Sequence, residues 1–235
     1  MTERLILGDC LEVLPTLPDS SIDFILTDLP YGTTQNKWDT VIPLPEMWAE
    51  FWRVLKPDGC IALTAQTPFS EALGFSQLKY LRYKWLWIKS RVTGFLNSKK
   101  APLKKTEDIL IFYKKPPLYN PQFSVGKPYK SIIKHQSSNY GNMQGCEIIN
   151  SGFRYPTDVL EFNSETGLHP TQKPVELFRY LIRTYTNEGD TVLDICSGSG
   201  TTALACVLEK RGFICIEKDE KYFEIMENRI LETLL

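Results

Sequence analysis

Short apolar runs alternate with longer amphipathic stretches along most of the chain. Runs rich in aliphatic and aromatic residues predict strands at residues 4–7, 22–27, 60–64, 84–88, 108–113, 192–195 and 213–217. Apolar positions at helical spacing predict helices at residues 44–55, 68–81, 175–185, 201–211 and 219–234. After Pro174, for example, Phe178, Leu181, Ile182 and Tyr185 recur at the spacing of one buried helix face.

Most of the predicted strands are followed by a helix. This order predicts an α/β fold with a mostly parallel, seven-stranded sheet that helices cover on both faces. The strands at 84–88 and 108–113 have no obvious helix between them, and we expect them to pair antiparallel. Because ligands of open parallel sheets gather at the carboxyl ends of the strands, candidate site residues are sought there.

Residues 115–168 interrupt this alternation. They contain Pro116, Pro117, Pro121, Pro128 and Pro156, together with five glycines, and show no clean periodicity. We interpret them as an irregular insert; the alternative is a flexible linker or lid. No helix-turn-helix or zinc-finger pattern is present, so no base sequence can be inferred from them.

The net charge of −1 conceals a very uneven distribution of charge. Residues 79–134 contain fourteen Lys and Arg and two acidic residues, which leaves 13 basic and 26 acidic residues in the rest of the chain. A basic segment interleaved with tyrosine and tryptophan is typical of a surface that binds nucleic acid. The alternative is a solvated face that compensates the acidic remainder. The candidate phosphate contacts are Lys89, Arg91, Lys99, Lys100, Lys104, Lys105, Lys127, Lys130 and Lys134.

Other features of the composition bound the class of protein. Six cysteines are scattered, mostly within apolar runs and with no C-x-x-C pair, which favours buried free thiols in a reducing cytoplasm. With two histidines in the chain, we expect no zinc site. No run of about eighteen apolar residues is present, and the N-terminal residues predict a strand and not a signal peptide. We therefore expect a cytoplasmic protein without a membrane span.

The first candidate site follows the predicted strand at 22–27. There Asp28, Leu29, Pro30 and Tyr31 place a carboxylate, a residue of fixed φ and an aromatic ring at one edge of the sheet. The carboxylate accepts hydrogen bonds, and the ring offers a flat face on which a planar base could stack. These groups suit an amino group attached to a nucleobase. The alternative is a turn in which Asp28 and Pro30 act only as turn formers.

A second candidate site follows the predicted strand at 192–195. A glycine-rich turn with Gly198 and Gly200 leads there into a helix, so a ligand can approach the backbone and the free N–H groups of the helix N-terminus. The next strand ends at Glu217, where a dinucleotide-type site holds ribose hydroxyls. The pattern indicates a nucleoside-containing cofactor. It lacks the G-x-G-x-x-G spacing, which disfavours a nucleotide-dependent dehydrogenase.

Together these segments resemble the β-class amino-methyltransferases of DNA. Residues 28–31 are similar to the family's catalytic Asp-Pro-Pro-Tyr motif, and residues 194–202 to its Asp-Pro-Phe-x-Gly-Ser-Gly-Thr-Thr cofactor loop. Residues 169–174 resemble its His-Pro-Thr-x-Lys-Pro segment. The resemblance covers nearly the whole chain, and the order of the motifs, with the catalytic motif first, marks the β class. It implies a Rossmann-like methyltransferase fold and S-adenosylmethionine (SAM) as cofactor.

The resemblance also implies roles for individual residues. The segment 8–10 would contact the adenine of SAM, Glu217 would hold the ribose, and residues 169–174 would lie beside the methionine end. The implied cofactor-binding residues are Asp9, Cys10, His169, Thr171, Lys173, Asp194, Ser197, Gly198, Ser199, Gly200, Thr201, Thr202 and Glu217. The expected catalytic and SAM-binding core spans residues 1–92, 106–114 and 169–235, and the expected target-recognition segments are 93–105 and 115–168.

Two departures from the family pattern affect these expectations. Leu29 replaces the first proline of the catalytic motif, so one fixed φ is lost while the backbone carbonyl is retained. Ile195 and Cys196 replace Pro-Phe in the cofactor loop, and the smaller side chain at 196 is expected to weaken SAM binding.

The implied reaction is methylation of the exocyclic N6 of an adenine that has left the duplex. Asp at position 28 favours adenine, because the cytosine enzymes of this family more often have Ser there. The alternatives are an N4-cytosine methyltransferase and a DNA-binding subunit that has lost catalysis. The sequence does not distinguish DNA from RNA, and it leaves open a homodimer and a restriction endonuclease partner.

Overall fold

The computed structural model describes residues 2–32, 39–132, 147–168 and 171–234 of the 235-residue chain. The chain forms two compact units. The larger unit comprises Met1–Asn120 and Asp158–Leu235, and the smaller unit is Pro121–Thr157.

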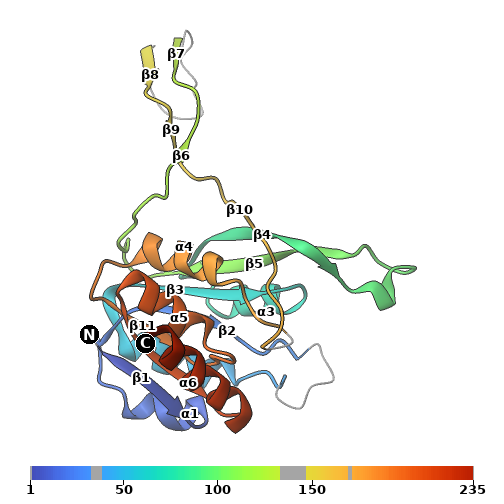
Figure 1. The fold of residues 1–235 in the computed structure, drawn as a ribbon, viewed down its shortest axis with the longest axis vertical. Coiled ribbons are helices and arrows are strands. Elements are labelled where there is room, and N and C mark those ends of the chain that lie inside the picture. The colour runs from blue at the N-terminus through green and yellow to red at the C-terminus, as the bar shows by residue number, and fades with distance from the viewer. Residues whose placement is uncertain (1, 33–38, 133–146, 169–170, 235) are drawn as a thin grey trace. The chain divides into compact units, whose positions relative to one another are not determined.

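The larger unit is built on a sheet with eight strands among the described residues, in the order β1-β12-β11-β2-β3-β5-β4-β10 (Figure 1). The strands are β1 (Glu3–Leu7), β2 (Ile22–Asp28), β3 (Leu55–Ala65), β4 (Leu81–Thr93), β5 (Lys104–Phe112), β10 (Val159–Phe162), β11 (Thr191–Asp194) and β12 (Gly212–Glu217). Among the described strands of this sheet, only β5 runs antiparallel to its neighbours, β3 and β4. The expected antiparallel pair is thus confirmed, since a hairpin without an α-helix joins β4 to β5.

Helices cover both faces of this sheet, as predicted. They are α1 (Cys10–Val13), α2 (Leu44–Val54), α3 (Phe69–Ser76), α4 (Val175–Tyr185), α5 (Thr201–Glu209) and α6 (Glu220–Leu234), with 3-10 turns η1 (Leu14–Thr16) and η2 (Phe95–Asn97). One buried cluster joins the sheet to α1, α2 and α3, and a second joins it to α4, α5 and α6. Along β2, Ile25 belongs to the first cluster and Phe24 and Leu26 to the second, as the alternation of side chains in a strand requires.

The sheet differs from the prediction by one strand. Residues 115–168 were expected to be irregular, but β10 within them pairs parallel to β4 at the sheet edge and buries Leu160. The predicted recognition segment 93–105 likewise overlaps the ends of β4 and β5. A four-residue edge strand between turns carries too little hydrophobic pattern to be predicted from its own residues.

The smaller unit consists of two short antiparallel ribbons. They pair β6 (Ser124–Val125) with β9 (Phe153–Arg154) and β7 (Tyr129–Ile132) with β8 (Glu147–Asn150). Gly152 has a φ of +109°, and a Cβ there would lie 2.7 Å from the carbonyl oxygen of Gly126, so only glycine fits this crossing. The role of the smaller unit in target recognition remains a prediction.

The described part of the chain contains neither a membrane-spanning helix nor a metal-binding cluster. No helix there is long and apolar enough to cross a membrane. No group of three or more His, Cys, Asp and Glu side chains is arranged there to hold a metal ion.

Candidate active site

A cavity of about 650 Å³ lies at the carboxyl ends of the parallel strands. Its volume is within the range of roughly 300–1,000 Å³ that is usual for small-molecule sites. Residues that follow β1, β2, β11 and β12 line it, and so do residues of β4 and β5. The predicted catalytic motif and the predicted cofactor loop therefore border one space.

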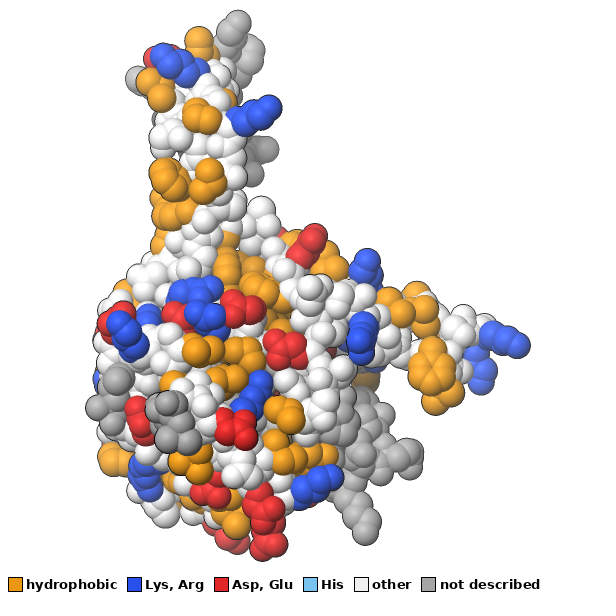
Figure 2. Space-filling model, in the orientation of Figure 1, with side chains coloured by type: hydrophobic (Ala, Val, Ile, Leu, Met, Phe, Trp, Pro, Cys, Tyr) orange, Lys and Arg blue, Asp and Glu red, His pale blue; other side chains and the backbone are white. Residues whose placement is uncertain are grey.

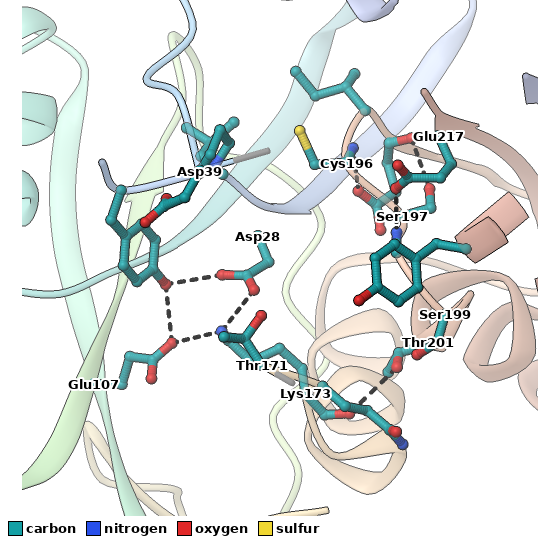
Figure 3. A pocket seen from close by; sticks show the side chains of 18 of the residues that line it. Asp28, Asp39, Glu107, Thr171, Lys173, Cys196, Ser197, Ser199, Thr201 and Glu217 are labelled. Atoms are coloured by element: carbon teal, nitrogen blue, oxygen red, sulfur yellow. Dashed lines mark hydrogen bonds and ion pairs between the residues drawn. The ribbon is translucent and has the colours of Figure 1, made fainter. Parts of the chain in front are cut away.

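Asp28, the last residue of β2, accepts hydrogen bonds from three parts of the chain: the turn after β2, strand β3 and the loop before α4. Its Oδ1 accepts a hydrogen bond from Tyr31 Oη at 2.8 Å and another from Thr64 Oγ1, while its Oδ2 accepts one from Lys173 Nζ at 2.7 Å. In Figure 3 the side chains of Asp28, Lys173 and Glu107 point toward one another. The orientation of the Asp28 carboxylate is thus fixed before any ligand binds.

Glu107, in β5, forms the centre of this network and was not predicted as a site residue. Its Oε1 lies 2.9 Å from Tyr31 Oη and 2.8 Å from Lys173 Nζ. Its Oε2 accepts from Gln66 Nε2 at 3.2 Å and lies 3.6 Å from Lys89 Nζ. The side chain is 6% exposed, so the carboxylate is buried among these partners.

The network balances two carboxylates against two ammonium groups in a buried setting. Burial by itself would lower the pKa of Lys173, but the adjacent carboxylates of Asp28 and Glu107 raise it. Burial would raise the pKa of Glu107, but the ammonium groups of Lys173 and Lys89 and the hydrogen bond from Tyr31 together outweigh it and lower the pKa. The pKa of Lys89 is lowered by burial. Lys173 and Glu107 are therefore charged at neutral pH and hold each other in place.

Tyr31 is fixed at both its hydroxyl and its ring. Burial, followed by the charges of Asp28 and Glu107, raises its pKa well above the usual value, so the phenol keeps its proton. That single proton is shared among Asp28, Glu107 and the hydroxyl oxygen of Thr64, which lies 3.1 Å away. The ring stacks on Phe69 with centroids 5.4 Å apart. The role of this ring as a platform for a base remains a prediction.

The other two residues of the motif lie in different surroundings. Leu29 is 3% exposed and packs in the first core cluster, so the side chain that replaces proline fills the core. Pro30 is half-buried and lines the cavity. Leucine at position 29 thus anchors the turn through packing where proline would have stiffened the backbone.

The predicted cofactor loop is organised by Asp194, the last residue of β11. Its Oδ1 accepts from the backbone N–H of Cys196 at 3.1 Å, and its Oδ2 accepts from Thr202 Oγ1 in the first turn of α5. The loop closes through a hydrogen bond of 2.8 Å from Gly200 N to the carbonyl of Ser197. Burial raises the pKa of Asp194 to about 6. Asp194 therefore joins the strand, the loop and the helix.

Glu217, at the end of β12, also supports the loop. Its Oε2 accepts from Gly198 N at 2.7 Å, and its Oε1 accepts from the backbone N–H groups of Lys218 and Asp219 at 3.0 and 2.9 Å. A carboxylate has four acceptor positions, and these donors fill three of them. The side chain lines the cavity and can accept one more hydrogen bond from a ligand.

Cys10 and Cys196 bring two thiols together at the cavity wall. A hydrogen bond between them lowers the pKa of Cys10 and raises that of Cys196. Asp9, beside them, caps α1 by accepting from Leu11 N at 2.9 Å. The five cysteines that the structure describes are free thiols.

The remaining predicted cofactor residues fall into three groups. Thr171, Lys173, Ser197, Gly198, Ser199 and Thr201 line the cavity. Gly200 and Thr202 are not among the lining residues; Gly200 is the N-cap of α5 and Thr202 is fully buried. His169 lies outside the described residues.

The predicted phosphate contacts are divided between surface and interior. Lys99, Lys100, Lys104, Lys105, Lys127, Lys130 and Arg91 are exposed. Lys89, by contrast, is 6% exposed and pairs with Glu107 inside the cavity wall, so it is placed for the interior network and not for an open surface. Lys134 lies outside the described residues.

Comparisons with known proteins identify the family. Residues 22–228 match the family described as "DNA methylase". The type II methyltransferase M.HpaI of Haemophilus parainfluenzae is 30% identical over 255 residues, covering 98% of this chain and 74% of that protein. The chain belongs to the amino-methyltransferases of DNA.

Further relatives agree in sequence and in fold. The DNA adenine methyltransferase YhdJ of Escherichia coli K12 is 29% identical over 249 residues, covering 97% of this chain and 82% of YhdJ. The crystal structure of the M1.HpyAVI–SAM complex superposes with a TM-score of 0.65 at 25% identity, covering 96% of this chain and 98% of that chain. The Rossmann-like fold and SAM as the cofactor of this family are thereby confirmed.

Proposed function

We propose that this methyltransferase transfers the methyl group of SAM to the exocyclic N6 of an adenine that has left the DNA duplex. The observation that carries the proposal is the position of Asp28. Its carboxylate is fixed at the end of β2, inside the cavity that also contains Glu217 and the glycine-rich loop. An acceptor for an amino group thus borders the space in which a nucleoside cofactor would lie.

The hydrogen-bond count at Asp28 supports a role toward an N–H donor. The carboxylate has four acceptor positions, of which Thr64 and Lys173 fill two and the Tyr31 proton, shared with Glu107, occupies a third. The fourth would receive one N–H of the target amino group, and the backbone carbonyl of Leu29 the other. With both hydrogens held, the nitrogen is drawn toward tetrahedral geometry and its lone pair is withdrawn from conjugation with the ring.

The remaining residues position the two reactants. When bound, SAM supplies an electrophilic methyl group on its sulfonium centre. Holding the amino nitrogen close to that group accounts for roughly 7–11 kcal/mol of barrier reduction in well-oriented systems. Lys173 and Glu107 keep Asp28 in one orientation throughout, because their charges are buried and mutually satisfied.

The cavity residues fit a SAM molecule. Glu217 retains one acceptor position for a ribose hydroxyl, and the loop from Ser197 to Gly200 brings backbone close to the ligand at the start of α5. The thiols of Cys10 and Cys196 and the half-buried Ile42 offer soft and apolar surface where the family resemblance implies the adenine. Thr171 and Lys173 would border the methionine end.

DNA binding is supported by the exposed basic residues of the segment 79–134. The target base must leave the stack to reach Asp28, which costs a few kcal/mol in known base-flipping enzymes. Adenine is favoured by Asp at position 28 and by the similarity to YhdJ, which is a DNA adenine methyltransferase.

Nucleoside mass spectrometry on unmethylated duplex DNA tests this proposal. DNA incubated with the purified protein and SAM is expected to contain N6-methyladenine. N4-methylcytosine in its place would retain the mechanism and overturn the choice of base. Methylation of RNA alone would contradict the proposed substrate.

A further inference from the structure

The β4–β5 hairpin ends in a tip where two large apolar side chains are exposed. Phe95 is 73% and Leu96 86% exposed, and both belong to the 3-10 turn η2. The hairpin extends beyond the neighbouring strands, and Figure 2 shows hydrophobic and basic side chains gathered at its end. Such exposure is unfavourable in water, so this turn is a candidate contact surface.

The backbone of the tip is ordered by its own hydrogen bonds. Gly94 enters the turn with a φ of +85°. Backbone N–H groups of Asn97 and Ser98 donate to the carbonyls of Gly94 and Phe95 at 3.0 and 3.1 Å, and Lys100 N donates to Asn97 O at 2.8 Å. The two apolar side chains are therefore presented from a structured turn, and little conformational freedom is lost when they bind.

The charge around the tip identifies its partner as a polyanion. Residues 90–106 are all exposed and contain Arg91, Lys99, Lys100, Lys104 and Lys105 but no acidic residue. Two copies of this chain meeting tip to tip would bring these cations together. The phosphates of DNA would instead compensate them, and apolar wedges between base steps commonly accompany such contacts.

The tip is also close to the cavity along the chain. Arg91, Val92 and Thr93 line the cavity, and Phe95 follows Thr93 by two residues. Two residues of extended chain span at most about 7 Å. A duplex that delivers a base into the cavity must therefore pass within reach of Phe95 and Leu96.

We propose that Phe95 and Leu96 form a wedge that enters the base stack beside the target nucleotide and fills the space that the flipped base leaves. This inference rests on the proposed function and deepens it, because it assigns the residues that stabilise the extruded state. Lys99 and Lys100 anchor the wedge on the adjacent phosphates.

The test compares variants on oligonucleotides that carry the recognition site, which is identified first by sequencing DNA methylated by the wild-type protein. The variants are Phe95→Ala/Leu96→Ala and a matched control, Phe75→Ala/Leu78→Ala, which removes equally large side chains that are 79% and 61% exposed elsewhere. A duplex with 2-aminopurine at the target position reports extrusion of the base by its fluorescence. A second duplex leaves the target base unpaired, which makes extrusion easier.

The wedge predicts a specific pattern. At saturating protein, Phe95→Ala/Leu96→Ala loses most of the fluorescence increase. Its kcat/KM on the paired duplex falls by about tenfold or more. Its kcat/KM on the unpaired target falls by less than about threefold, because an unpaired base leaves the stack more easily. SAM affinity stays at the wild-type value. The control variant matches the wild type in all four measurements.

Other results would overturn the inference. Unchanged fluorescence and kcat/KM in Phe95→Ala/Leu96→Ala would show that the tip does not assist extrusion. Equal losses on paired and unpaired targets would assign the tip to general binding, and a change of mass in light scattering with normal extrusion would assign it to contacts between copies. A wild-type protein that methylates no DNA would remove the proposed function, and the inference with it.

Discussion

At the scale of single residues, two carboxylates share one lysine and one tyrosine at the cavity wall. Glu107 contacts both Tyr31 and Lys173, which are also the partners of Asp28. The orientation of the expected amino-group acceptor therefore depends on a residue in a different strand. Lys89 completes the charge balance from β4.

Substituting Glu107→Gln is expected to destabilise the protein. The change leaves two buried ammonium groups against one carboxylate, and breaking a buried pair on one side costs about 3–5 kcal/mol. Urea unfolding measures the loss.

The double variant Glu107→Gln/Lys89→Met provides the control. It removes one cation and one anion, so part of the stability lost in Glu107→Gln should return. The cycle also needs the single variant Lys89→Met. If the loss in the double variant equals the sum of the losses in the two single variants, Lys89 and Glu107 are not coupled.

Some of these residues could be predicted from the sequence and others could not. Asp28 and Glu217 end apolar runs, and the carboxyl ends of parallel strands meet at one edge, so their proximity follows from pattern and topology. Glu107 and Lys89 lie within strands of the basic segment, where Lys89 was predicted as a phosphate contact. Only the register of the β4–β5 hairpin brings them inside, and no local pattern specifies that register.

At the scale of elements, the entry to α5 requires glycine. Gly200 has a φ of +78°, and a Cβ there would lie 2.6 Å from Cγ of the buried Met226 in α6. A non-glycine residue in this left-handed conformation costs about 1–3 kcal/mol before any overlap. Gly200→Ala is therefore expected to lower both stability and SAM affinity, as urea unfolding and calorimetric SAM titration would measure.

Gly189→Ala separates the cost of the left-handed backbone conformation from the cost of the overlap with Met226. Gly189 has a φ of +89°, but a Cβ there meets no atom within 4 Å. It should show only the conformational cost and no change in SAM affinity. Equal losses of stability and SAM affinity in Gly189→Ala and Gly200→Ala would mean that the overlap with Met226 contributes nothing to the loss at Gly200.

The end of β11 gives a pH-dependent prediction. The pKa of Asp194 is about 6 in the folded state, against a usual value of 3.8. Folding thus favours the protonated form, and the stability that this group contributes is complete below pH 4 and lost as pH rises to about 6. The difference between pKa values of about 6 and 3.8 corresponds to about 3 kcal/mol.

Unfolding free energies of the wild type and Asp194→Asn measure this effect between about pH 3 and pH 7. The difference in unfolding free energy between the two proteins should change by about 3 kcal/mol over that range. The wild type should lose stability relative to Asp194→Asn as pH rises. A difference that is constant with pH would contradict the burial of an ionisable Asp194.

The elements themselves were largely predictable. The helix expected at 175–185 is α4 with the same bounds, because Pro174 sets its start and four apolar residues define its buried face. The helix expected at 68–81 ends earlier, at Ser76, since Gln77 leaves the helical conformation and the chain turns toward β4. Edge strand β10 was missed because its pairing with β4 is a tertiary event.

At the scale of the whole molecule, the cavity and the smaller unit are separate parts of the chain. None of the described residues that line the cavity belongs to Pro121–Thr157. Replacing residues 121–157 by a flexible linker should leave SAM affinity within about twofold of the wild type. It should reduce DNA methylation and the salt dependence of DNA binding, because Lys127 and Lys130 are removed. Unchanged methylation of DNA would exclude this unit from target binding.

We expect Asp28 to act on the target amino group and to leave cofactor binding to the other half of the cavity. Parallel measurements of methyl transfer to DNA and of SAM affinity, for the wild type and Asp28→Ala, test it most directly. Asp28→Ala is expected to lose turnover by at least about 10²–10³-fold, as for other positioned hydrogen-bonding groups, and to retain its SAM affinity. Loss of SAM binding in Asp28→Ala, or turnover close to that of the wild type, would contradict it.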